Sequence, residues 1–375
     1  MGIASRLKSS AVLAISAFVG LMRIWFRDNR INRSRIGQVA VQTSINSYRE
    51  SALLYVAARL GLADLLAGSP RDSHELALST GAHEPSLYRI LRGLVVMGIL
   101  SEKRNGRFAL TSLGTWLLSG KRDSLRNAAI LCGEGRYLAF GSLFKSVMTG
   151  EPAWSSPGTT CYEYRKQNPE LDKSFNMEMT RRTGWAVKSI LASYDFNSFR
   201  TVADIGGGHG ALLAAILKSY PSHSGILFDQ HHVVEGARHY LEKAGIAARC
   251  RIVEGDFLNP IPISADMIIL KNILHNWDDE RCRIILKNCR DALGNGCKLL
   301  LVERLMPERV KDNADTIWLD LWMLAQMGGR ERTADEYREL LAASGFSATQ
   351  ILPTSSQLWI IEAARTDLPE PQSVS

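Results

Sequence analysis

The chain has 375 residues, of which 46% are hydrophobic and 22% are charged. This length predicts two domains, and the composition is that of a folded globular protein, which argues against a disordered or membrane-spanning chain. The formal net charge is +7, but seven basic residues against one acid fall before residue 49 and account for +6 of it, so the charge gives little indication of nucleic-acid binding by the remaining chain.

The six cysteines lie between residues 132 and 297 and include no Cys-x-x-Cys pair. Neither a disulfide framework nor a zinc site is therefore predicted. We expect a reducing, cytoplasmic location and no bound metal.

Residues 1–37 form a basic and partly apolar arm. Its apolar run from Ala11 to Met22 follows Arg6 and Lys8, as in the first part of a secretory signal, but no clean small-x-small cleavage site separates it from Arg23. The run is also shorter than the about 20 apolar residues that span a bilayer. An interfacial amphipathic helix, a helix packed on a partner subunit and an ordinary tail remain open, and membrane contact is the less favoured of these.

Residues 38–150 are predicted to be a mainly helical domain. Apolar residues recur at helical spacing between Ser47 and Leu66, and Gly61 marks a possible break. Asp72 or Ser73 can cap a short helix through Leu78, and Thr80-Gly81 forms the turn that follows it. Pro85 then opens a further helix, which completes a helix-turn-helix.

The stretch from Ile99 to Leu110 is typical of a hairpin, with a type I′ turn favoured by Asn105-Gly106. Hairpin and helices together indicate a winged helix, which could bind DNA or support dimerisation. Only Arg89 and Arg92 are basic between residues 85 and 98, so dimerisation is favoured over DNA binding. More helix is expected from Ser124 to Thr149.

After a helical linker over residues 151–198, short apolar runs alternate with helices, which predicts a parallel, doubly wound Rossmann-like α/β sheet over residues 199–365. A final pair of runs could close the sheet as an antiparallel hairpin, and the tail 366–375 is expected to be disordered. The predicted strands are Thr201–Ile205, Gly225–Phe228, Cys250–Val253, Ala265–Leu270, Lys298–Val302, Ala348–Leu352 and Leu358–Ala363.

The first strand of this sheet ends in Asp204 and a Gly-Gly-Gly-His-Gly cluster. Such glycines let a ligand approach the backbone at the carboxyl end of the strand, and the spacing differs from the G-x-G-x-x-G of dinucleotide sites. Asp229 at the end of the second strand suits ribose hydroxyls. Asp256 and Phe257, after the third, suit an amine and the face of a purine. These features predict a nucleoside ligand without phosphates.

On these motifs, the chain from Thr201 to Arg365 resembles the catalytic domain of S-adenosylmethionine-dependent O-methyltransferases of the caffeate, hydroxyneurosporene and polyketide type. The region from about Gln38 resembles their dimerisation domain, so the resemblance implies a homodimer. It further implies S-adenosylmethionine as the cofactor. Asp204 belongs to the same motif. The other implied cofactor-binding residues are Gly206, Gly208, Gly210, Asp229, Asp256, Phe257, Lys271 and Trp277.

The resemblance implies that His275 is the general base. A phenol is mostly protonated at neutral pH, and an imidazole is the side chain best suited to take its proton. Glu303 and Glu331 match positions that flank this histidine, where a carboxylate can fix its tautomer and stabilise the imidazolium. No metal is needed, because the sulfonium is already activated.

By the same resemblance, Phe175, Met179 and Met323 match positions that contact the aromatic acceptor. The loop from Ala325 to Gly329 is one residue shorter than in the plant enzymes, so caffeate specificity is not carried over. We expect a small fused-ring phenol of secondary metabolism. Two alternatives stay open: a cofactor-binding relative that hydroxylates or decarboxylates its ligand, and a winged-helix DNA-binding regulator.

Overall fold

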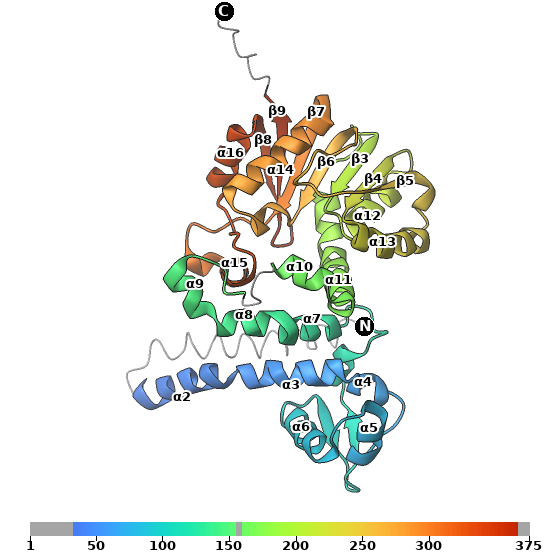
Figure 1. The fold of residues 1–375 in the computed structure, drawn as a ribbon, viewed down its shortest axis with the longest axis vertical. Helices are drawn as coiled ribbons and strands as arrows, with labels where there is room; N and C mark the ends of the chain where they lie inside the picture. Colours follow the sequence, from blue (N-terminus) through green and yellow to red (C-terminus); the bar gives the residue numbers. More distant parts are fainter. Residues whose placement is uncertain (1–32, 155–159, 367–375) are drawn as a thin grey trace, which may run out of the picture.

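A computed structural model describes residues 33–154 and 160–366. Figure 1 shows helices at the amino-terminal end, a twisted sheet flanked by helices at the other end, and a layer of helices between them. This arrangement confirms the predicted helical domain followed by a Rossmann-like α/β domain. The outer parts of the N-terminal arm and of the C-terminal tail lie outside the described residues.

The amino-terminal helices follow from local sequence signals. Helix α5 begins with a capping box, in which the Asp72 side chain accepts from Glu75 N and the Glu75 side chain accepts from Asp72 N, and it ends at Gly81 in the left-handed region. These helices bury a small core around Leu76, Leu91 and Phe108. Their bounds are α2 (Arg33–Asn46), α3 (Tyr48–Arg59), α4 (Leu62–Leu65), α5 (Ser73–Thr80) and α6 (Glu84–Val96).

The hairpin β1 (Leu100–Glu102) and β2 (Phe108–Leu110) forms as predicted, but its turn is not type I′. A type I′ turn needs positive φ at both central residues, and only Gly106, with φ 73°, has it. Gly106 N donates to Lys103 O and Lys103 N donates to Arg107 O, which is a type I turn followed by a left-handed glycine. The prediction erred because Asn-Gly also suits this longer loop.

The helix expected from residue 124 to 149 is divided into shorter pieces. Helix α7 (Arg126–Leu131) runs into a π-helical turn, η2 (Cys132–Arg136), before α8 (Tyr137–Gly141) and α9 (Leu143–Thr149). After the link, α10 (Cys161–Lys166) precedes the long helix α11 (Pro169–Ser193). Figure 1 shows α10, α11 and α15 between the amino-terminal helices and the sheet.

The seven-stranded sheet has the order β5-β4-β3-β6-β7-β9-β8, with five parallel strands and a closing antiparallel pair. Its strands are β3 (Thr201–Ile205), β4 (Ser224–Asp229), β5 (Cys250–Glu254), β6 (Ala265–Lys271), β7 (Leu293–Glu303), β8 (Phe346–Pro353) and β9 (Trp359–Arg365). The helices that follow in this domain and cover the sheet are α12 (Ala211–Ser219), α13 (His231–Ala244), α14 (Asp279–Ala292) and α16 (Ala334–Ala343), while α15 (Ala314–Gln326) lies in the middle layer.

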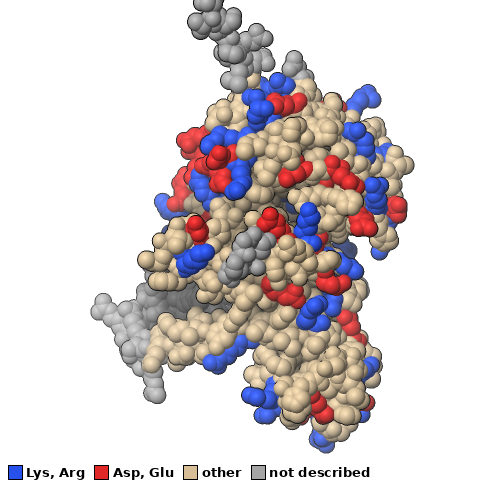
Figure 2. Space-filling model, in the orientation of Figure 1, with Lys and Arg blue, Asp and Glu red and all other residues tan. Residues whose placement is uncertain are grey.

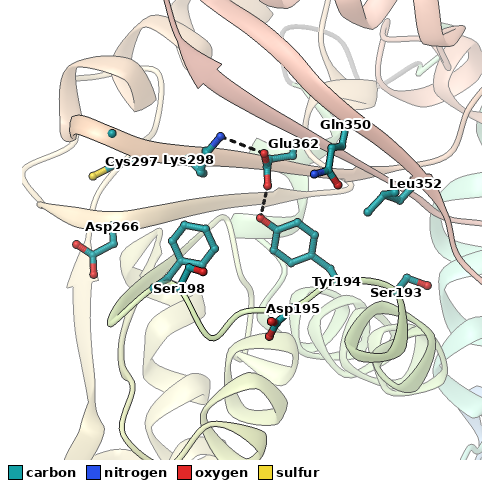
Figure 3. A pocket seen from close by; sticks show the side chains of 12 residues that line it. Ser193, Tyr194, Asp195, Ser198, Asp266, Cys297, Lys298, Gln350, Leu352 and Glu362 are labelled. Atoms are coloured by element: carbon teal, nitrogen blue, oxygen red, sulfur yellow. Dashed lines mark hydrogen bonds and ion pairs between the residues drawn. The ribbon is translucent and has the colours of Figure 1, made fainter.

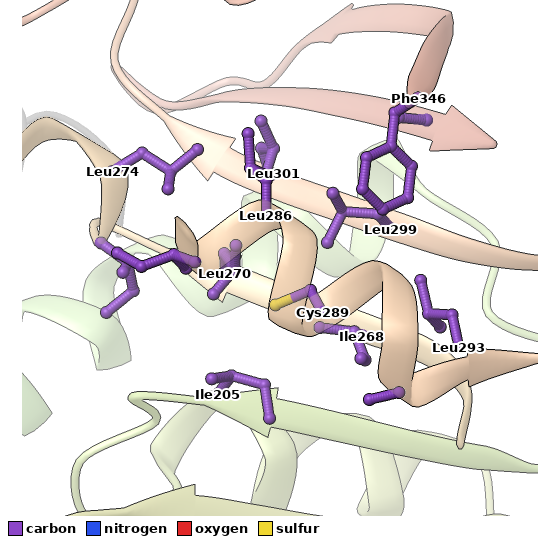
Figure 4. Packing of buried hydrophobic residues seen from close by; sticks show 14 of the residues in the cluster. Ile205, Ile268, Leu270, Leu274, Leu286, Cys289, Leu293, Leu299, Leu301 and Phe346 are labelled. Carbon is purple, nitrogen blue, oxygen red and sulfur yellow. The ribbon is translucent and has the colours of Figure 1, made fainter. Parts of the chain in front are cut away.

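Apolar side chains cover both faces of this sheet. On the face shown in Figure 4, Leu286 and Cys289 of α14 pack against Ile268 and Leu299 of the central strands. The other face packs against α11, α12 and α13. Burial on both faces explains the continuous apolar runs of the strands, and it fixes the carboxyl ends of β3, β4, β6 and β7 at one edge.

No helix within residues 33–154 and 160–366 is long and apolar enough to cross a membrane. The predicted arm is described only from Arg33, where α2 begins, so helix α2 starts before the boundary expected at residue 38. The apolar run from Ala11 to Met22 lies outside the described residues.

A polar network joins α11 to the opposite edge of the sheet, at the amino ends of the parallel strands. Tyr194 Oη donates to Glu362 Oε2 at 2.6 Å, and Lys298 Nζ donates to Glu362 Oε1 at 3.1 Å (Figure 3). The Thr349 hydroxyl also donates to Glu362. Glu362 is 8% exposed, and despite its burial these partners hold its pKa below the usual value.

Tyr194→Phe should therefore destabilise the protein by about 1.5–3 kcal/mol, because it removes one hydrogen bond to a buried carboxylate. Urea unfolding followed by circular dichroism measures this loss. Tyr220→Phe is the matched control, since the Tyr220 hydroxyl makes only longer hydrogen bonds of 3.3 and 3.4 Å and should lose less. Equal losses in the two variants would contradict the role assigned to the network.

Candidate active site

The glycine cluster after β3 brings bare backbone to the carboxyl edge of the sheet. Gly206 and Gly208 have φ of 67° and 59°, a region that favours glycine. A Cβ at Gly206 would lie 2.6 Å from Ile273, and one at Gly207 would lie 2.6 Å from Asp204. Gly206 and Gly207 therefore have no room for a side chain, and the space beside Gly208 is open, so a ligand can lie directly against the main chain of the loop.

Two buried carboxylates flank this loop. Gly208 N donates to Asp229 Oδ2 and Gln230 N donates to Asp229 Oδ1, both at 2.8 Å, while burial raises the pKa of Asp229 to about 6. Asp204 is 1% exposed and neither of its carboxylate oxygens has a hydrogen-bond partner. Burial raises the pKa of Asp204 to about 7, and nearby Lys271 opposes that rise. Asp204 thus lacks a donor that a cationic ligand would supply.

A cavity of about 1010 Å³ opens beside these carboxylates. Its walls come from the carboxyl ends of β3, β4 and β6, from α10 and α11, and from the end of α15. Ten of the residues singled out in the sequence line it: Phe175, Met179, Asp204, Gly206, Gly208, Asp229, Asp256, Phe257, Lys271 and Trp277. Residues from α11 and from the strand ends of the sheet therefore meet around one space large enough for two small ligands.

Aromatic rings form one end of this cavity. Trp277 lies edge-on to Phe257, with ring centroids 6.0 Å apart, and its Nε1 is buried without a hydrogen-bond partner. Tyr162 of α10 stacks on Trp277 with centroids 5.5 Å apart and planes inclined by 4°. Flat apolar faces and an unpaired donor at this end suit a purine.

The buried ionisable cluster at His275 lies behind the cavity wall. His275 and the two glutamates are at most 6% exposed. His275 Nδ1 is 2.7 Å from Glu331 Oε1 and 3.9 Å from Glu303 Oε2. Glu303 Oε1 accepts from Ile273 N and Leu274 N, both at 2.9 Å. Burial acts to lower the pKa of His275, but the two carboxylates outweigh it and raise that pKa above its usual value.

Arg332 and Gly329 hold the loop that carries the histidine. Arg332 is fully buried, and its guanidinium donates to Leu274 O at 3.0 Å and to Trp277 O at 2.9 Å. A Cβ at Gly329 would overlap the carbonyl oxygen of His275. The Glu331 loop thus contacts the main chain of the His275 loop directly, which fixes the position of the imidazole ring.

Five of the residues expected at the site do not line the cavity. Gly210, with φ 78°, precedes α12, and Met323 is 3% exposed within α15. His275, Glu303 and Glu331 are buried next to the lining residues Ile273 and Trp277. The roles assigned to all of these residues stay predictions.

Sequence reasoning did not single out Tyr162, Arg165 or Arg332. Tyr162 and Arg165 lie on a six-residue helix after an irregular link, where no periodic pattern marks them. Arg332 follows Glu331 directly in the sequence. Its charge next to a residue that matches the family motif could have marked it as part of the site.

This geometry agrees with what the chain matches. A family described as the O-methyltransferase domain covers residues 140–347, and one described as the O-methyltransferase dimerisation domain covers residues 43–120. The chain belongs to the S-adenosylmethionine-dependent O-methyltransferases. Neither a hydroxylase or decarboxylase activity nor a DNA-binding role is favoured by these matches.

Similar O-methyltransferases come from antibiotic-producing bacteria. The phenazine O-methyltransferase PhzM of Lysobacter antibioticus is 43% identical over 337 residues, which cover 90% of this chain and 98% of that enzyme. The crystal structure of LaPhzM has a TM-score of 0.82 and covers 88% of this chain and 99% of its own. The methyltransferase NcsB1 from neocarzinostatin biosynthesis was solved with S-adenosylmethionine and 2-hydroxy-5-methyl naphthoic acid. It is 32% identical with a TM-score of 0.75, and the match covers 84% of this chain and 96% of NcsB1.

The cofactor of this O-methyltransferase is S-adenosylmethionine, and the cavity described above fits it. The cofactor is a cationic nucleoside without phosphates. The cavity offers it an unpartnered carboxylate at Asp204, a glycine loop without side chains and aromatic rings at Trp277. Within the described residues, no group of three or more His, Cys, Asp or Glu side chains could hold a metal ion.

Proposed function

We propose that this enzyme transfers the methyl group of S-adenosylmethionine to a phenolic hydroxyl of a small aromatic acceptor, with His275 as general base. The observation that carries the proposal is the buried hydrogen bond of 2.7 Å between His275 and Glu331, next to the cofactor cavity. A buried imidazole between two carboxylates is suited to accept a proton and to be stabilised once charged.

We infer that the cofactor is held as follows. Asp204 faces its amino group, the loop Gly206 to Gly208 lies along its methionine part, and Asp229 accepts from its ribose hydroxyls. Gly210 supports that loop by allowing the turn into α12. The adenine lies near Asp256, Phe257 and Trp277. Lys271 stays close to Asp204, whose charge opposes the lowering of the Lys271 pKa by burial.

The acceptor would occupy the other half of the cavity, against Phe175 and Met179. Met323 would support this wall from within α15. Flat apolar side chains favour an aromatic ring, and the polarizable Met179 thioether suits contact with it. The named substrates of the relatives, a phenazine and a naphthoic acid, are small fused-ring compounds.

In this mechanism the cofactor supplies an activated methyl group on a sulfonium sulfur. His275 Nδ1 is hydrogen-bonded to Glu331, which leaves Nε2 to take the proton of the phenol. Methyl transfer to the phenolate oxygen would break the sulfur–methyl bond and leave the cofactor as a neutral thioether, and His275 would later return its proton to solvent. Glu303 and Glu331 stabilise the imidazolium in between, while Arg332 and Gly329 keep the ring in place.

His275→Ala should lower kcat by roughly 10²–10⁴-fold and leave binding of S-adenosylhomocysteine nearly unchanged, because only proton transfer is lost. Turnover of labelled cofactor with a panel of fused-ring phenols measures the first quantity, and calorimetry measures the second. His239→Ala, at an exposed position of α13, is the matched control. Full activity of His275→Ala would refute the mechanism. A product heavier by one oxygen atom would indicate oxygenation in place of methylation.

Catalysis should also depend on pH through His275. Neutral imidazole is needed, so kcat/KM should fall as the pH drops below the raised pKa of His275. Glu331→Gln removes one of the carboxylates that raise this pKa, so the acid limb of the profile should move to lower pH while kcat at the plateau drops by roughly 10²-fold or more.

Glu339→Gln, at an exposed position of α16, gives the same charge change as Glu331→Gln and should leave the pH profile unshifted. A pH profile in Glu331→Gln that stays in place, or moves to higher pH, would exclude His275 as the titrating base.

We further propose that the enzyme is a homodimer. Helices α2, α8 and α9 expose a set of large apolar side chains in the single chain: Val39, Val41, Ile45, Leu138, Phe140, Phe144, Val147 and Met148. Figure 2 shows mostly uncharged side chains around α2 and α8. This surface lies beside the region matched by the dimerisation domain, and a surface of this kind favours a protein partner.

Phe144→Asp should shift the protein from dimer to monomer in sedimentation velocity, because a charge would be buried in the interface. Leu78→Asp is the matched control, since Leu78 is 74% exposed on α5 and Phe144 is 78% exposed on α9. A wild-type monomer, or a dimer unaffected by Phe144→Asp, would contradict this interface.

A further inference from the structure

Three arginines from separate elements gather beyond the aromatic wall of the acceptor half. Arg136 comes from the π-helical turn η2, Arg165 from α10 and Arg182 from α11. The guanidinium groups of Arg136 and Arg182 lie 3.5 and 5.4 Å from the ring centroid of Trp322. Arg165 is near enough for its charge to act on Arg136. π-Helical turns are rare and occur often at functional sites, which gives the placement of Arg136 added weight.

Arg136 has no anionic partner within the described residues. Its Nε and Nη2 atoms are shielded from solvent and make no hydrogen bond. Burial, followed by the charge of Arg182, lowers the pKa of Arg136 to about 9. Buried charged donors are normally paired, so an unpaired guanidinium of this kind is expected where a ligand completes the site.

The nearest carboxylate is already engaged by other arginines. Glu178 is 1% exposed and accepts from Arg181 Nε and Nη2, both at 2.7 Å, and from Arg182 Nε at 2.9 Å. No carboxylate lies within ion-pair distance of Arg136 or Arg165 in residues 33–154 and 160–366. The cluster therefore keeps an excess of positive charge.

The cluster adjoins the cavity through its lining residues. Arg165 lines the cavity itself, is 9% exposed, and has its guanidinium 3.8 Å from the ring centroid of Phe175. In the sequence of α11, Arg182 falls between Met179 and Thr183, which both line the cavity. The guanidinium of Arg136 stacks 3.5 Å from the ring centroid of Trp322.

The turn that carries Arg136 also approaches the cavity. Gly135, the residue before Arg136, lies so close to Gln326 and Trp154 that a Cβ there would be 3.1 and 3.6 Å from their side chains. Both Gln326 and Trp154 line the cavity. Arg165 thus lies on the cavity wall, and Arg136 lies behind that wall on the turn whose Gly135 approaches two lining residues.

We propose that the acceptor is an aromatic acid, whose carboxylate is bound by Arg136 and Arg165, with Arg182 adding positive charge. This inference rests on the proposed function, because it identifies the substrate class of the same site. A planar guanidinium matches the two oxygens of a carboxylate, and its aromatic stacking leaves the donor edge free for the ligand. The carboxylate would place the ring against Phe175 and Met179.

The test compares a hydroxynaphthoic acid with its carboxamide, which has the same shape and no charge. With S-adenosylhomocysteine bound, calorimetry of the full chain should give at least about 10-fold tighter binding of the acid. Arg136→Gln and Arg165→Gln should each reduce the acid-to-amide preference by roughly 10- to 100-fold, the range for a lost charge-assisted hydrogen bond.

Arg283→Gln is the matched control, since Arg283 is exposed on α14, and it should keep the wild-type preference. Arg136→Lys keeps the charge but loses the planar guanidinium, so its acid-to-amide preference should lie between those of the wild type and Arg136→Gln. This variant also tests the proposal if Arg136→Gln does not fold. Equal binding of acid and amide by the wild type, or an unchanged preference in both glutamine variants, would overturn the proposal.

Turnover measured with the same pair separates this inference from the proposed function. Preferential binding of the acid without methylation of either compound would keep the arginine site and refute the proposed reaction. Methylation of both compounds at equal kcat/KM would keep the reaction and refute the arginine site.

Discussion

The hydrogen bond between His275 and Glu331 is the interaction on which the site depends. It joins a loop after β6 to a loop after α15, 56 residues further along the chain. Both ends are buried, so the bond can persist only if the surrounding groups compensate the cost of removing charge from water. The backbone N–H groups of Ile273 and Leu274 supply part of that compensation by donating to Glu303, and Arg332 holds the His275 loop by donating to its carbonyl oxygens. The sheet positions the His275 loop because it aligns the end of β6, the strand that precedes this loop.

The cost of burying polar groups away from water also indicates where ligands would bind, because several buried groups at the site lack hydrogen-bond partners. Asp204, Arg136 and the Nε1 of Trp277 are buried polar groups without partners, and each lies at or beside the cavity. A folded protein rarely leaves such groups unpaired, because each one lowers its stability. The unpaired carboxylate of Asp204 lines the cavity that fits the cationic cofactor, whereas the unpaired guanidinium of Arg136 lies behind the residues that line this cavity, where we propose that an anionic group of the acceptor binds.

Local signals in the sequence predicted the elements well where they act alone. The strand Thr201–Ile205 was predicted with its observed bounds. Asp72 caps the start of α5 as expected, but the helix continues to Thr80, two residues beyond the predicted end at Leu78. The turn at Gly106 and the π-helical turn before Tyr137 could not be predicted, because they depend on loop length and on packing between helices that are distant in sequence. For the same reason, the motifs and the family resemblance pointed to ten residues that line the cavity but not to Arg165, which also lines it, or to Arg136.

The close contact at Gly329 constrains how enzymes of this kind can diverge. Because even a methyl group there would overlap the carbonyl of His275, a side chain cannot be added at Gly329 without moving the loop that carries His275. The wall of the acceptor half comes instead from α10, α11 and the turn before α8, which share no such contact with His275. Substitutions in that wall can therefore alter the shape of the cavity while the contacts that hold His275 are kept, so acceptor specificity can change independently of the His275 site.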